Sequence, residues 1–260
     1  YPSRFYLGNQ TPISGSTLTA VKSLDFEAGS TQYYVSGTAI ASLANIDYGT
    51  IVAWVKPESA NSDRILVACE NSGGSQHYRV GSGYSSTRVV MVATQDVATE
   101  ADFSVPLTTT TSDDADWCML AYSRENGVAY SYMGIGEGGK VHSSAHGGNN
   151  GDFIGTVSSG EYLSIGRSGK SVRTDYMDGL ISQVAIYGGT ATSDHLTQTQ
   201  LQSIYDLGPA GDARTVTSTN LYFYYNANLE SGTRVSGGSP NKIYDLVTTD
   251  GTTDLSAGPA

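Results

Sequence analysis

Residues 50–57 read TIVAWVKP, an apolar run that reaches Lys and Pro only at its end. In a β-strand, successive side chains point to opposite faces of the sheet. Alternation along this run gives one face of Ile51, Ala53 and Val55 and another of Val52, Trp54 and Lys56. Because both faces are largely apolar, the run predicts a strand deep inside a sandwich, covered by packed side chains on both sides.

Similar short runs recur on both sides of this stretch. They are rich in β-branched and aromatic residues and are separated by clusters of Gly, Ser, Asn and Asp, which predicts many antiparallel strands rather than alternating strands and helices. The clearest lie at residues 23–27, 32–37, 64–70, 77–81, 88–94, 116–124, 128–136, 162–167, 178–188 and 221–227. So many strands in one chain predict an all-β fold of two stacked antiparallel sheets.

One segment predicts a helix, near residues 198–207. Thr197 and Gln200 have the spacing of a capping box at its start, and Gly208 marks its end. We expect a helix of two turns lying on a sheet edge. The apolar stripe that would pack it into the core consists of Leu201, Ile204 and Tyr205.

The composition excludes several classes of protein. Charged residues make up 15% of the chain, which argues against a coiled coil and against long solvated helices. The 25 acidic and 14 basic side chains give a net charge of −11, and such a chain would repel the phosphates of a nucleic acid. No apolar run reaches the length of about 18 residues that a membrane helix needs. We therefore expect neither nucleic-acid binding nor membrane insertion.

The two cysteines, Cys69 and Cys118, are too few to build a disulfide framework in a chain of 260 residues. Each lies in a predicted strand, where a free thiol behaves as a small buried hydrophobe. A single disulfide between two strands is the alternative. No His flanks either cysteine, so the sequence does not favour a thiol nucleophile.

Six motifs follow one another in a recognisable order. They are LDFEAGSTQYYV (24–35), GTIVAWVKPE (49–58), RILVACEN (64–71), DWCMLAYSRENG (116–127), YLSIGR (162–167) and DGLISQVAIYGG (178–189). Their order resembles that of the laminin-G-like, concanavalin A-like jelly roll. The resemblance implies a jelly-roll sandwich with one concave sheet, whose rim loops hold calcium or a sugar in many relatives.

The last part of the chain differs in composition from the rest. A Tyr-rich run, LYFYYNA (221–227), precedes an acidic and turn-rich end, which resembles the C-terminal extension of laminin-G-like modules in tailed-phage structural proteins. We expect an N-terminal arm at residues 1–19 and a laminin-G-like jelly roll at residues 20–208. Residues 209–260 would then form a short C-terminal extension with one strand, which packs on the sandwich or contacts a neighbouring molecule.

The chain lacks the catalytic motif that the resemblance associates with glycoside hydrolases of this fold. Those enzymes carry two carboxylates on one strand, in the pattern E-x-D-x-E or E-x-D-x-x-E, because retaining hydrolysis needs the two groups about 5 Å apart. No Glu of this sequence begins such a pattern. The sequence therefore predicts a protein that is not an enzyme, although a cleft built from distant carboxylates stays open as an alternative.

A Gly-, Ser- and Asn-rich stretch at residues 136–160 predicts a long loop, and long loops in compact domains are often functional. Its two His residues lack the pattern of a zinc site and have a plain interpretation as solvated loop residues. The functional interpretation is a polar rim that binds a sugar through hydrogen bonds and an aromatic ring. The candidate ligand-binding residues are His142, His146, Asn149, Asn150, Asp152 and Tyr84.

Several Asp residues are candidates for calcium ligands, because Ca²⁺ is held by six to eight oxygens. Asp113, Asp114 and Asp116 cluster before a predicted strand, and Asp25 and Asp178 lie within motifs of the resemblance. Asp is equally common as a turn former. Calcium therefore remains a possible cofactor in the sequence interpretation, and no other cofactor is expected.

Two functions follow from these expectations. The first is a non-enzymatic structural, decoration or surface-attachment module, displayed as a virion component or on a cell surface, that contacts virion or cell-surface proteins and self-associates. The alternative is a secreted, lectin-like glycan-binding module, assisted by calcium. Both place the chain on a virion surface or outside the cell.

Overall fold

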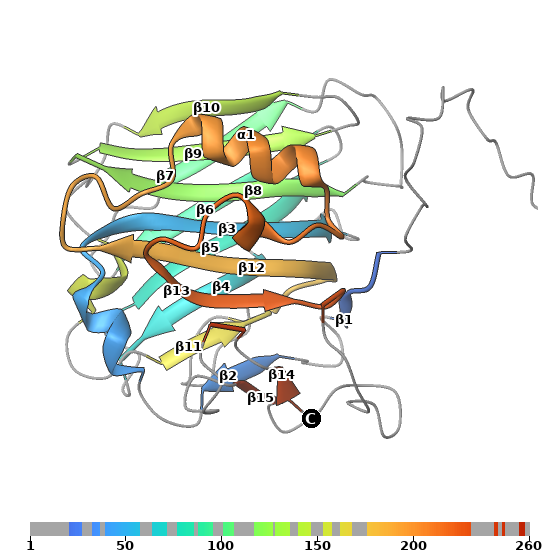
Figure 1. The fold of residues 1–260 in the computed structure, drawn as a ribbon. Helices are drawn as coiled ribbons and strands as arrows, with labels where there is room; N and C mark the ends of the chain where they lie inside the picture. Colours follow the sequence, from blue (N-terminus) through green and yellow to red (C-terminus); the bar gives the residue numbers. More distant parts are fainter. Residues whose placement is uncertain are drawn as a thin grey trace, which may run out of the picture.

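The computed structural model consists of two antiparallel β-sheets stacked face to face, with one α-helix on the outside (Figure 1). This confirms the predicted jelly-roll sandwich. The residues that the structure describes are 21–27, 33–36, 40–57, 64–71, 77–85, 88–95, 101–106, 117–126, 128–135, 140–146, 153–157, 162–167, 176–229, 242–243, 246–247 and 255–257.

Sheet A has seven strands in the order β1-β12-β3-β8-β9-β10, with β13 also paired to β12. Its strands are β1 (Leu24–Phe26), β3 (Tyr48–Pro57), β8 (Cys118–Glu125), β9 (Val128–Ile135), β10 (Val141–His146), β12 (Gly179–Gly189) and β13 (Leu221–Asn226). One edge of β12 pairs with β3 along its whole length. The other edge pairs with β1 at residues 179–181 and with β13 at residues 183–187, so β1 and β13 lie end to end.

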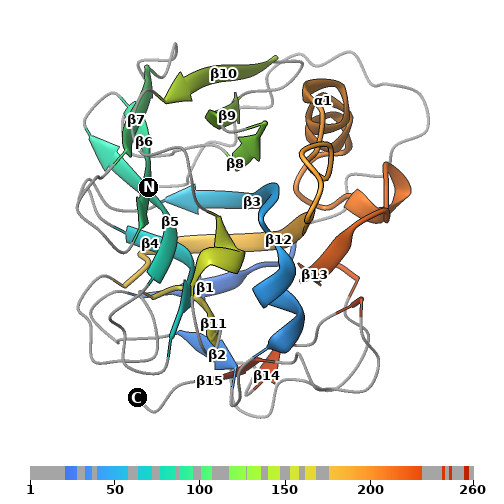
Figure 2. The same cartoon turned by 90° about the vertical axis from the view of Figure 1, so that its left-hand side faces the viewer.

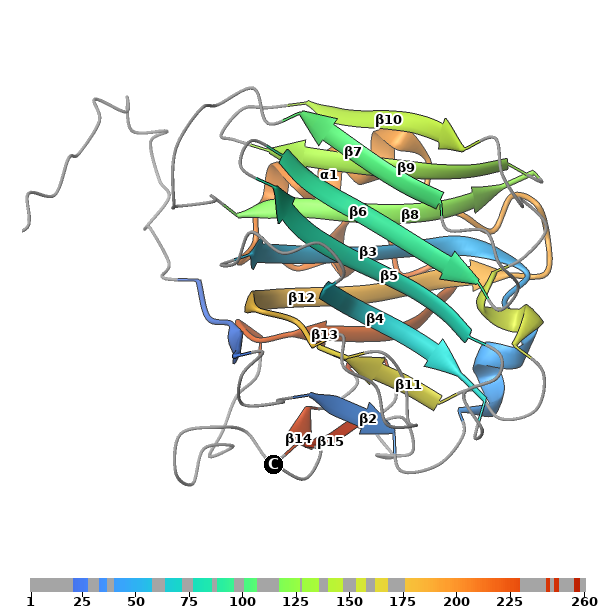
Figure 3. The ribbon, with the colours of Figure 1, turned by 180° about the vertical axis from the view of Figure 1, so that it is seen from behind.

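Sheet B has eight strands in the order β14-β15-β2-β11-β4-β5-β6-β7 (Figure 3). They are β2 (Tyr34–Ser36), β4 (Arg64–Glu70), β5 (His77–Ser85), β6 (Arg88–Gln95), β7 (Ala101–Pro106), β11 (Tyr162–Ile165), β14 (Lys242–Ile243) and β15 (Leu255–Ala257). Short 3-10 helices are η2 (Ala41–Asn45), η3 (Ile154–Thr156) and η4 (Ala213–Thr215). No described helix is long and apolar enough to cross a lipid bilayer.

Sheet A carries a hydrophobic core on each of its two faces. Ile51, Ala53 and Val55 of β3 belong to the core between the sheets. Val52 and Trp54 belong to a second core, on the outer face, which the helix α1 (Gln198–Leu207) and neighbouring residues cover. The prediction that residues 50–57 form a strand buried on both faces is therefore confirmed.

Helix α1 begins and ends where the sequence predicts. Thr197 Oγ1 accepts a hydrogen bond from the Gln200 backbone, and the Gln200 side chain accepts one from the Thr197 backbone, which is a capping box. Gly208 follows the last turn with a φ of 73°, a conformation that favours glycine. The predicted apolar stripe is confirmed as core packing, since Leu201, Ile204 and Tyr205 are all buried.

The expected position of the helix on a sheet edge is wrong. Helix α1 lies across the outer face of sheet A (Figure 2). Its Tyr205 ring stacks on Trp54 of β3, with ring centroids 5.5 Å apart and planes 7° from parallel. At the far side of the sheet, Gln202 Oε1 accepts a 2.9 Å hydrogen bond from the Val141 backbone of β10. The helix lies on the face and not at the edge because it buries the apolar side chains of Val52 and Trp54, which point outward from sheet A.

All the runs predicted to be strands form strands, but four described strands were not predicted: β7, β10, β14 and β15. The long loop expected at residues 136–160 is wrong in part, since Val141–His146 pair with β9 and Ile154–Thr156 form η3. β10 is the last strand of sheet A in the described order. An edge strand needs less apolar patterning than a central one. The polar sequence VHSSAH of β10 therefore did not predict a strand.

The segment after α1 contributes to both sheets. β13 extends sheet A beside β12, and β15 pairs with β2 in sheet B. The expectation of one strand in residues 209–260 was too low, because β14 and β15 are also described there. The division into an arm, a jelly roll and an extension remains a prediction.

Both cysteines are buried, and neither forms a disulfide. Cys69 lies on β4 in sheet B and Cys118 on β8 in sheet A, and both belong to the core between the sheets. The interpretation as small buried hydrophobes is confirmed, and the disulfide alternative is not realised.

Candidate functional site

The predicted sugar-binding residues are only partly placed by the structure. His142 and His146 lie on β10, where their register partners on β9 are Met133 and Ala129. Tyr84 lies on β5 of the other sheet, opposite Val89. Asn149, Asn150 and Asp152 lie outside the described residues. The sugar-binding rim therefore stays a prediction.

The predicted calcium ligands do not gather in the described structure. Asp25 is exposed on β1, and Asp178 is half-buried just before β12. Asp113, Asp114 and Asp116 lie outside the described residues. Within the described residues, no group of three or more His, Cys, Asp or Glu side chains could hold a metal ion.

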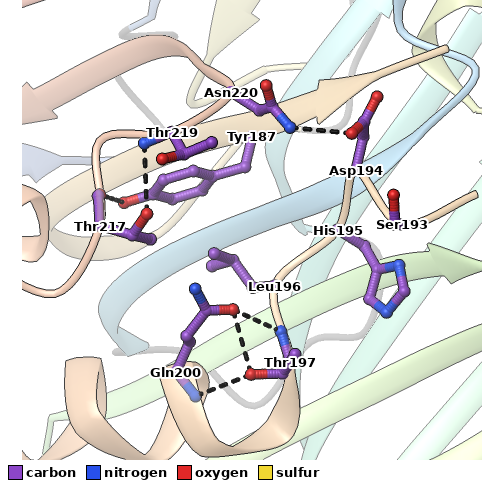
Figure 4. Close-up of a pocket in the computed structure, with 10 residues that line it drawn as sticks. All are labelled: Tyr187, Ser193, Asp194, His195, Leu196, Thr197, Gln200, Thr217, Thr219 and Asn220. Carbon is purple, nitrogen blue, oxygen red and sulfur yellow. Dashed lines mark hydrogen bonds between the residues drawn. The ribbon is translucent and has the colours of Figure 1, made fainter. Parts of the chain in front are cut away.

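The structure describes a polar hollow at the end of β12, next to the start of α1 (Figure 4). Its volume is about 170 Å³, less than the roughly 300–1,000 Å³ of an ordinary small-molecule pocket. Three segments form its walls: the end of β12, the connection from β12 to α1, and the connection that leads into β13. The lining residues are Tyr187, Ser193, Asp194, His195, Leu196, Thr197, Gln200, Thr217, Thr219 and Asn220.

Asp194 holds two walls of the hollow together. Its Oδ2 accepts a 2.9 Å hydrogen bond from the Ala191 backbone, and its Oδ1 accepts one of 2.9 Å from Asn220 Nδ2. Gly189 makes this possible, because a Cβ at residue 189 would clash with the Asp194 carboxylate. A glycine at residue 189 is therefore a requirement for the position of Asp194.

Asn220 is fixed by its backbone as well as by its side chain. It has a φ of 57°, a left-handed conformation that Asn adopts more readily than most residues. Its carbonyl accepts a 2.8 Å hydrogen bond from the backbone of Gly188. The side chain of Asn220 is thus held at the mouth of the hollow by β12 and by Asp194.

A chain of buried hydrogen bonds anchors the connection before α1 to sheet A. The Leu196 backbone donates to Thr50 Oγ1 at 2.9 Å. Thr50 Oγ1 lies 3.0 Å from Ser123 Oγ, which donates to the Gly49 carbonyl at 3.2 Å. Because Ser123 uses its proton on Gly49, the hydroxyl of Thr50 donates to Ser123. The floor of the hollow, Leu196, is therefore attached to both β3 and β8.

His195 is oriented by its own turn. Its Nδ1 lies 2.9 Å from the Thr192 carbonyl, and because a carbonyl only accepts, Nδ1 carries the proton. Its Nε2 lies 3.7 Å from Glu125 Oε2, and the other oxygen of Glu125 accepts a hydrogen bond from Tyr132. The His195 ring therefore lies between the Thr192 carbonyl and the Glu125 carboxylate.

Tyr187 forms the most deeply buried wall of the hollow. Burial raises the pKa of its hydroxyl above the ordinary value for tyrosine, and the nearby Tyr224 and Asp212 raise it further. The protonated hydroxyl donates to the Thr217 carbonyl at 3.3 Å. The wall at Tyr187 is therefore an uncharged aromatic surface.

This hollow could not be predicted from the sequence, because its residues come from three separate stretches and no motif joins them. Two local signals were present: the paired glycines at the end of residues 178–189, and the capping box that turns the chain into α1. Neither signal indicates that Thr217, Thr219 and Asn220 lie opposite.

The family model of the concanavalin A-like lectin/glucanases superfamily, in its laminin-G form, matches residues 27–197. No curated protein matches the chain.

Several solved structures are similar to the chain at low sequence identity. The sialidase CBM40 of Ruminococcus gnavus, bound to α2,3-sialyllactose, is 13% identical over 70% of this chain and 96% of that chain, with a TM-score of 0.45. A heptameric SAP-like pentraxin of Limulus polyphemus is 14% identical over 68% of this chain and 76% of that chain, with a TM-score of 0.47. Tailspike protein 2 of an Escherichia coli O157:H7 bacteriophage is 13% identical over 82% of this chain and 31% of that chain, with a TM-score of 0.45.

The two-sheet fold agrees with the family match, and the match covers more than half of the chain. The chain belongs to the concanavalin A-like lectin/glucanases superfamily.

Proposed function

We propose that this chain is a non-enzymatic surface-attachment module, in which the sandwich is a rigid platform and recognition takes place at its rim. The observation that carries the proposal is the second hydrophobic core. Because α1 covers the outer face of sheet A over Trp54, with Ala213 and Val216 beside it in the same core, no open substrate cleft runs across that face in the described part of the chain. Contacts with other molecules are then left to the ends and edges of the sandwich.

A binding role suits this chain better than catalysis does. The superfamily contains lectins and glucanases by its own description. The paired carboxylates of the glycoside hydrolase motif are missing from the whole sequence. We therefore propose that the module binds glycans, with calcium as a possible aid that the sequence alone suggests.

The test of glycan binding is an array of neutral and acidic glycans probed with the full chain, followed by calorimetry on any positive glycan. If binding is unchanged after EGTA removes calcium, glycan recognition does not require calcium. Binding lost in His146→Ala or Asn149→Ala would support the predicted rim at residues 142–152. An array that stays silent across both glycan classes would contradict a glycan-binding role.

A structural role on a virion or cell surface is the second proposal. It is favoured by the Tyr-rich run at residues 221–227 and the acidic end after it, which resemble extensions of tailed-phage structural proteins. This role requires contact with neighbouring proteins or with copies of the same chain. Light scattering on the purified chain tests it, and a defined oligomer is expected. A chain that is monomeric in solution and is also absent from purified virions would contradict this role.

A further inference from the structure

The hollow beside α1 offers polar groups that the protein does not use itself. Gln200 Oε1 accepts hydrogen bonds from the backbone and hydroxyl of Thr197, which leaves the two protons of Gln200 Nε2 without a partner among the described residues. Asn220 donates through Nδ2 to Asp194. Its own Oδ1 accepts no hydrogen bond from the described residues. Ser193 and Thr219 add hydroxyls with no described partner.

These polar side chains belong to residues that line one small space. Figure 4 shows Tyr187, Thr219 and Asn220 on one side of it and Thr197 and Gln200 on the other, with Leu196 between them. Neighbouring hydroxyls of a sugar ring each donate and accept one or more hydrogen bonds. An apolar floor at Leu196 and an aromatic wall at Tyr187 suit the C–H faces of the same ring.

The charges around the hollow discriminate against anions. Asp194 lines it and Glu125 lies behind His195, whereas no Lys or Arg is among the lining residues. The chain as a whole carries a net charge of −11. A carboxylate of a sialic or uronic acid would meet the Asp194 carboxylate there with no Lys or Arg in the lining to pair with, which is unfavourable.

We propose that this hollow is a binding site for one neutral sugar ring, and that it rejects acidic sugars. The proposal rests on the proposed glycan-binding function and names a site and a ligand class for it. The volume of about 170 Å³ limits the site to a single ring, so the rest of a glycan would extend into solvent.

The experiment is an NMR titration of the isotope-labelled full chain with methyl β-D-galactoside, methyl α-D-glucoside and methyl β-D-glucuronide. We expect amide shifts at residues 193–200 and 217–220 with at least one neutral glycoside. The glucuronide is expected to bind about tenfold more weakly at the same residues, because an unpaired charge or a lost hydrogen bond costs on the order of a factor of ten.

Two variants and a control locate the effect. Ser193→Ala removes one free hydroxyl, and Asn220→Gly removes the free acceptor while glycine keeps the left-handed backbone. Each is expected to weaken binding of the neutral glycoside several-fold. Thr199→Ala, on the exposed side of the first turn of α1, should leave it unchanged.

The outcomes separate this site from the proposed function. Shifts confined to residues 142–152 would overturn the hollow as the site and leave glycan binding intact. Equal binding of the glucuronide would overturn the selectivity for neutral sugars. No shift with any glycoside, together with a silent array, would overturn both proposals.

Discussion

At the scale of single residues, the hydroxyl of Thr50 joins three parts of the molecule: β3, β8 and the connection before α1. Thr50→Val keeps the shape of the side chain but leaves the Leu196 N–H without its acceptor. We expect the variant to lose about 1–3 kcal/mol of unfolding free energy, the cost of one buried unpaired group. Urea unfolding followed by circular dichroism measures it, with the exposed Thr199→Ala as control. Equal midpoints for Thr50→Val and the wild type would contradict the role of Thr50.

The two thiols offer a second residue-scale prediction. Burial raises the pKa of Cys118 to about 12. Both Cys69 and Cys118 are buried thiols outside any disulfide. Because the thiolate is the reactive form, we expect neither cysteine to react with Ellman's reagent at pH 8 in the folded chain, and both to react in denaturant. One reactive thiol in the native chain, or none in the denatured chain, would contradict this arrangement.

The pair of Asp212 and Arg214 predicts a dependence of stability on pH. Burial raises the pKa of Asp212, but the hydrogen bonds and charge of Arg214 outweigh it, so the pKa is lower than its usual 3.8. A lowered pKa means that the pair stabilises the fold above pH 3.8 and that this contribution is lost as the pH falls through the folded pKa. Asp212→Asn should therefore be less stable than the wild type at pH 7, with a smaller difference at pH 3. Urea unfolding at both pH values checks it, and a difference that grows in acid would refute it.

At the scale of elements, α1 packs closely on sheet A because residue 134 of β9 is a glycine. A Cβ at this residue would clash with the Tyr205 ring, which is also stacked on Trp54. Gly134→Ala should push Tyr205 away and cost about 1–3 kcal/mol of unfolding free energy, as overpacking of a core does. The emission of Trp54, followed in a Trp117→Phe background, should shift to longer wavelength as the helix lifts. Unchanged emission and stability would mean that α1 tolerates the methyl group.

The elements themselves were predictable from the sequence wherever the signal was local. The strand at residues 50–57 and the capping box of α1 each depend on residues close together in the sequence, and both are confirmed. β10 was missed because an edge strand tolerates a polar sequence. The prediction that α1 lies on a sheet edge was wrong, because the helix packs against Trp54 and Gly134, which are far apart in the chain.

The candidate site was less predictable than the fold. The hollow is made by Asp194, Gln200 and Asn220, whose proximity depends on β13 pairing beside β12. No sequence spacing encodes that pairing, since it results from the packing of the whole sheet. The sequence instead pointed to residues 142–152, where composition alone carried the signal.

At the scale of the whole molecule, the segment after α1 is joined to the sandwich by a dense network. β13 places Phe223, Tyr224 and Tyr225 in the two cores, each almost completely buried. The Tyr224 hydroxyl accepts a hydrogen bond from the Ala213 backbone and donates to Gln183 of β12. Burial raises the pKa of Tyr224 to about 12, so the hydroxyl keeps its proton at neutral pH. The segment therefore belongs energetically to the jelly roll that precedes it.

This packing predicts the effect of truncation. A chain that ends at Gly208 would leave one edge of β12 bare along residues 183–187 and would empty the places of three aromatic side chains. Since losing a single buried aromatic side chain costs about 3–5 kcal/mol and a whole domain is stable by only about 5–15 kcal/mol, we expect this chain not to fold. A chain that ends at Leu229 keeps β13 and loses β14 and β15, so it should still unfold cooperatively, at a lower denaturant midpoint. Near-ultraviolet circular dichroism and urea unfolding of the two truncated chains distinguish these outcomes. If the chain ending at Gly208 folded cooperatively, residues 209–260 would be an independent extension and the jelly roll would be complete without β13.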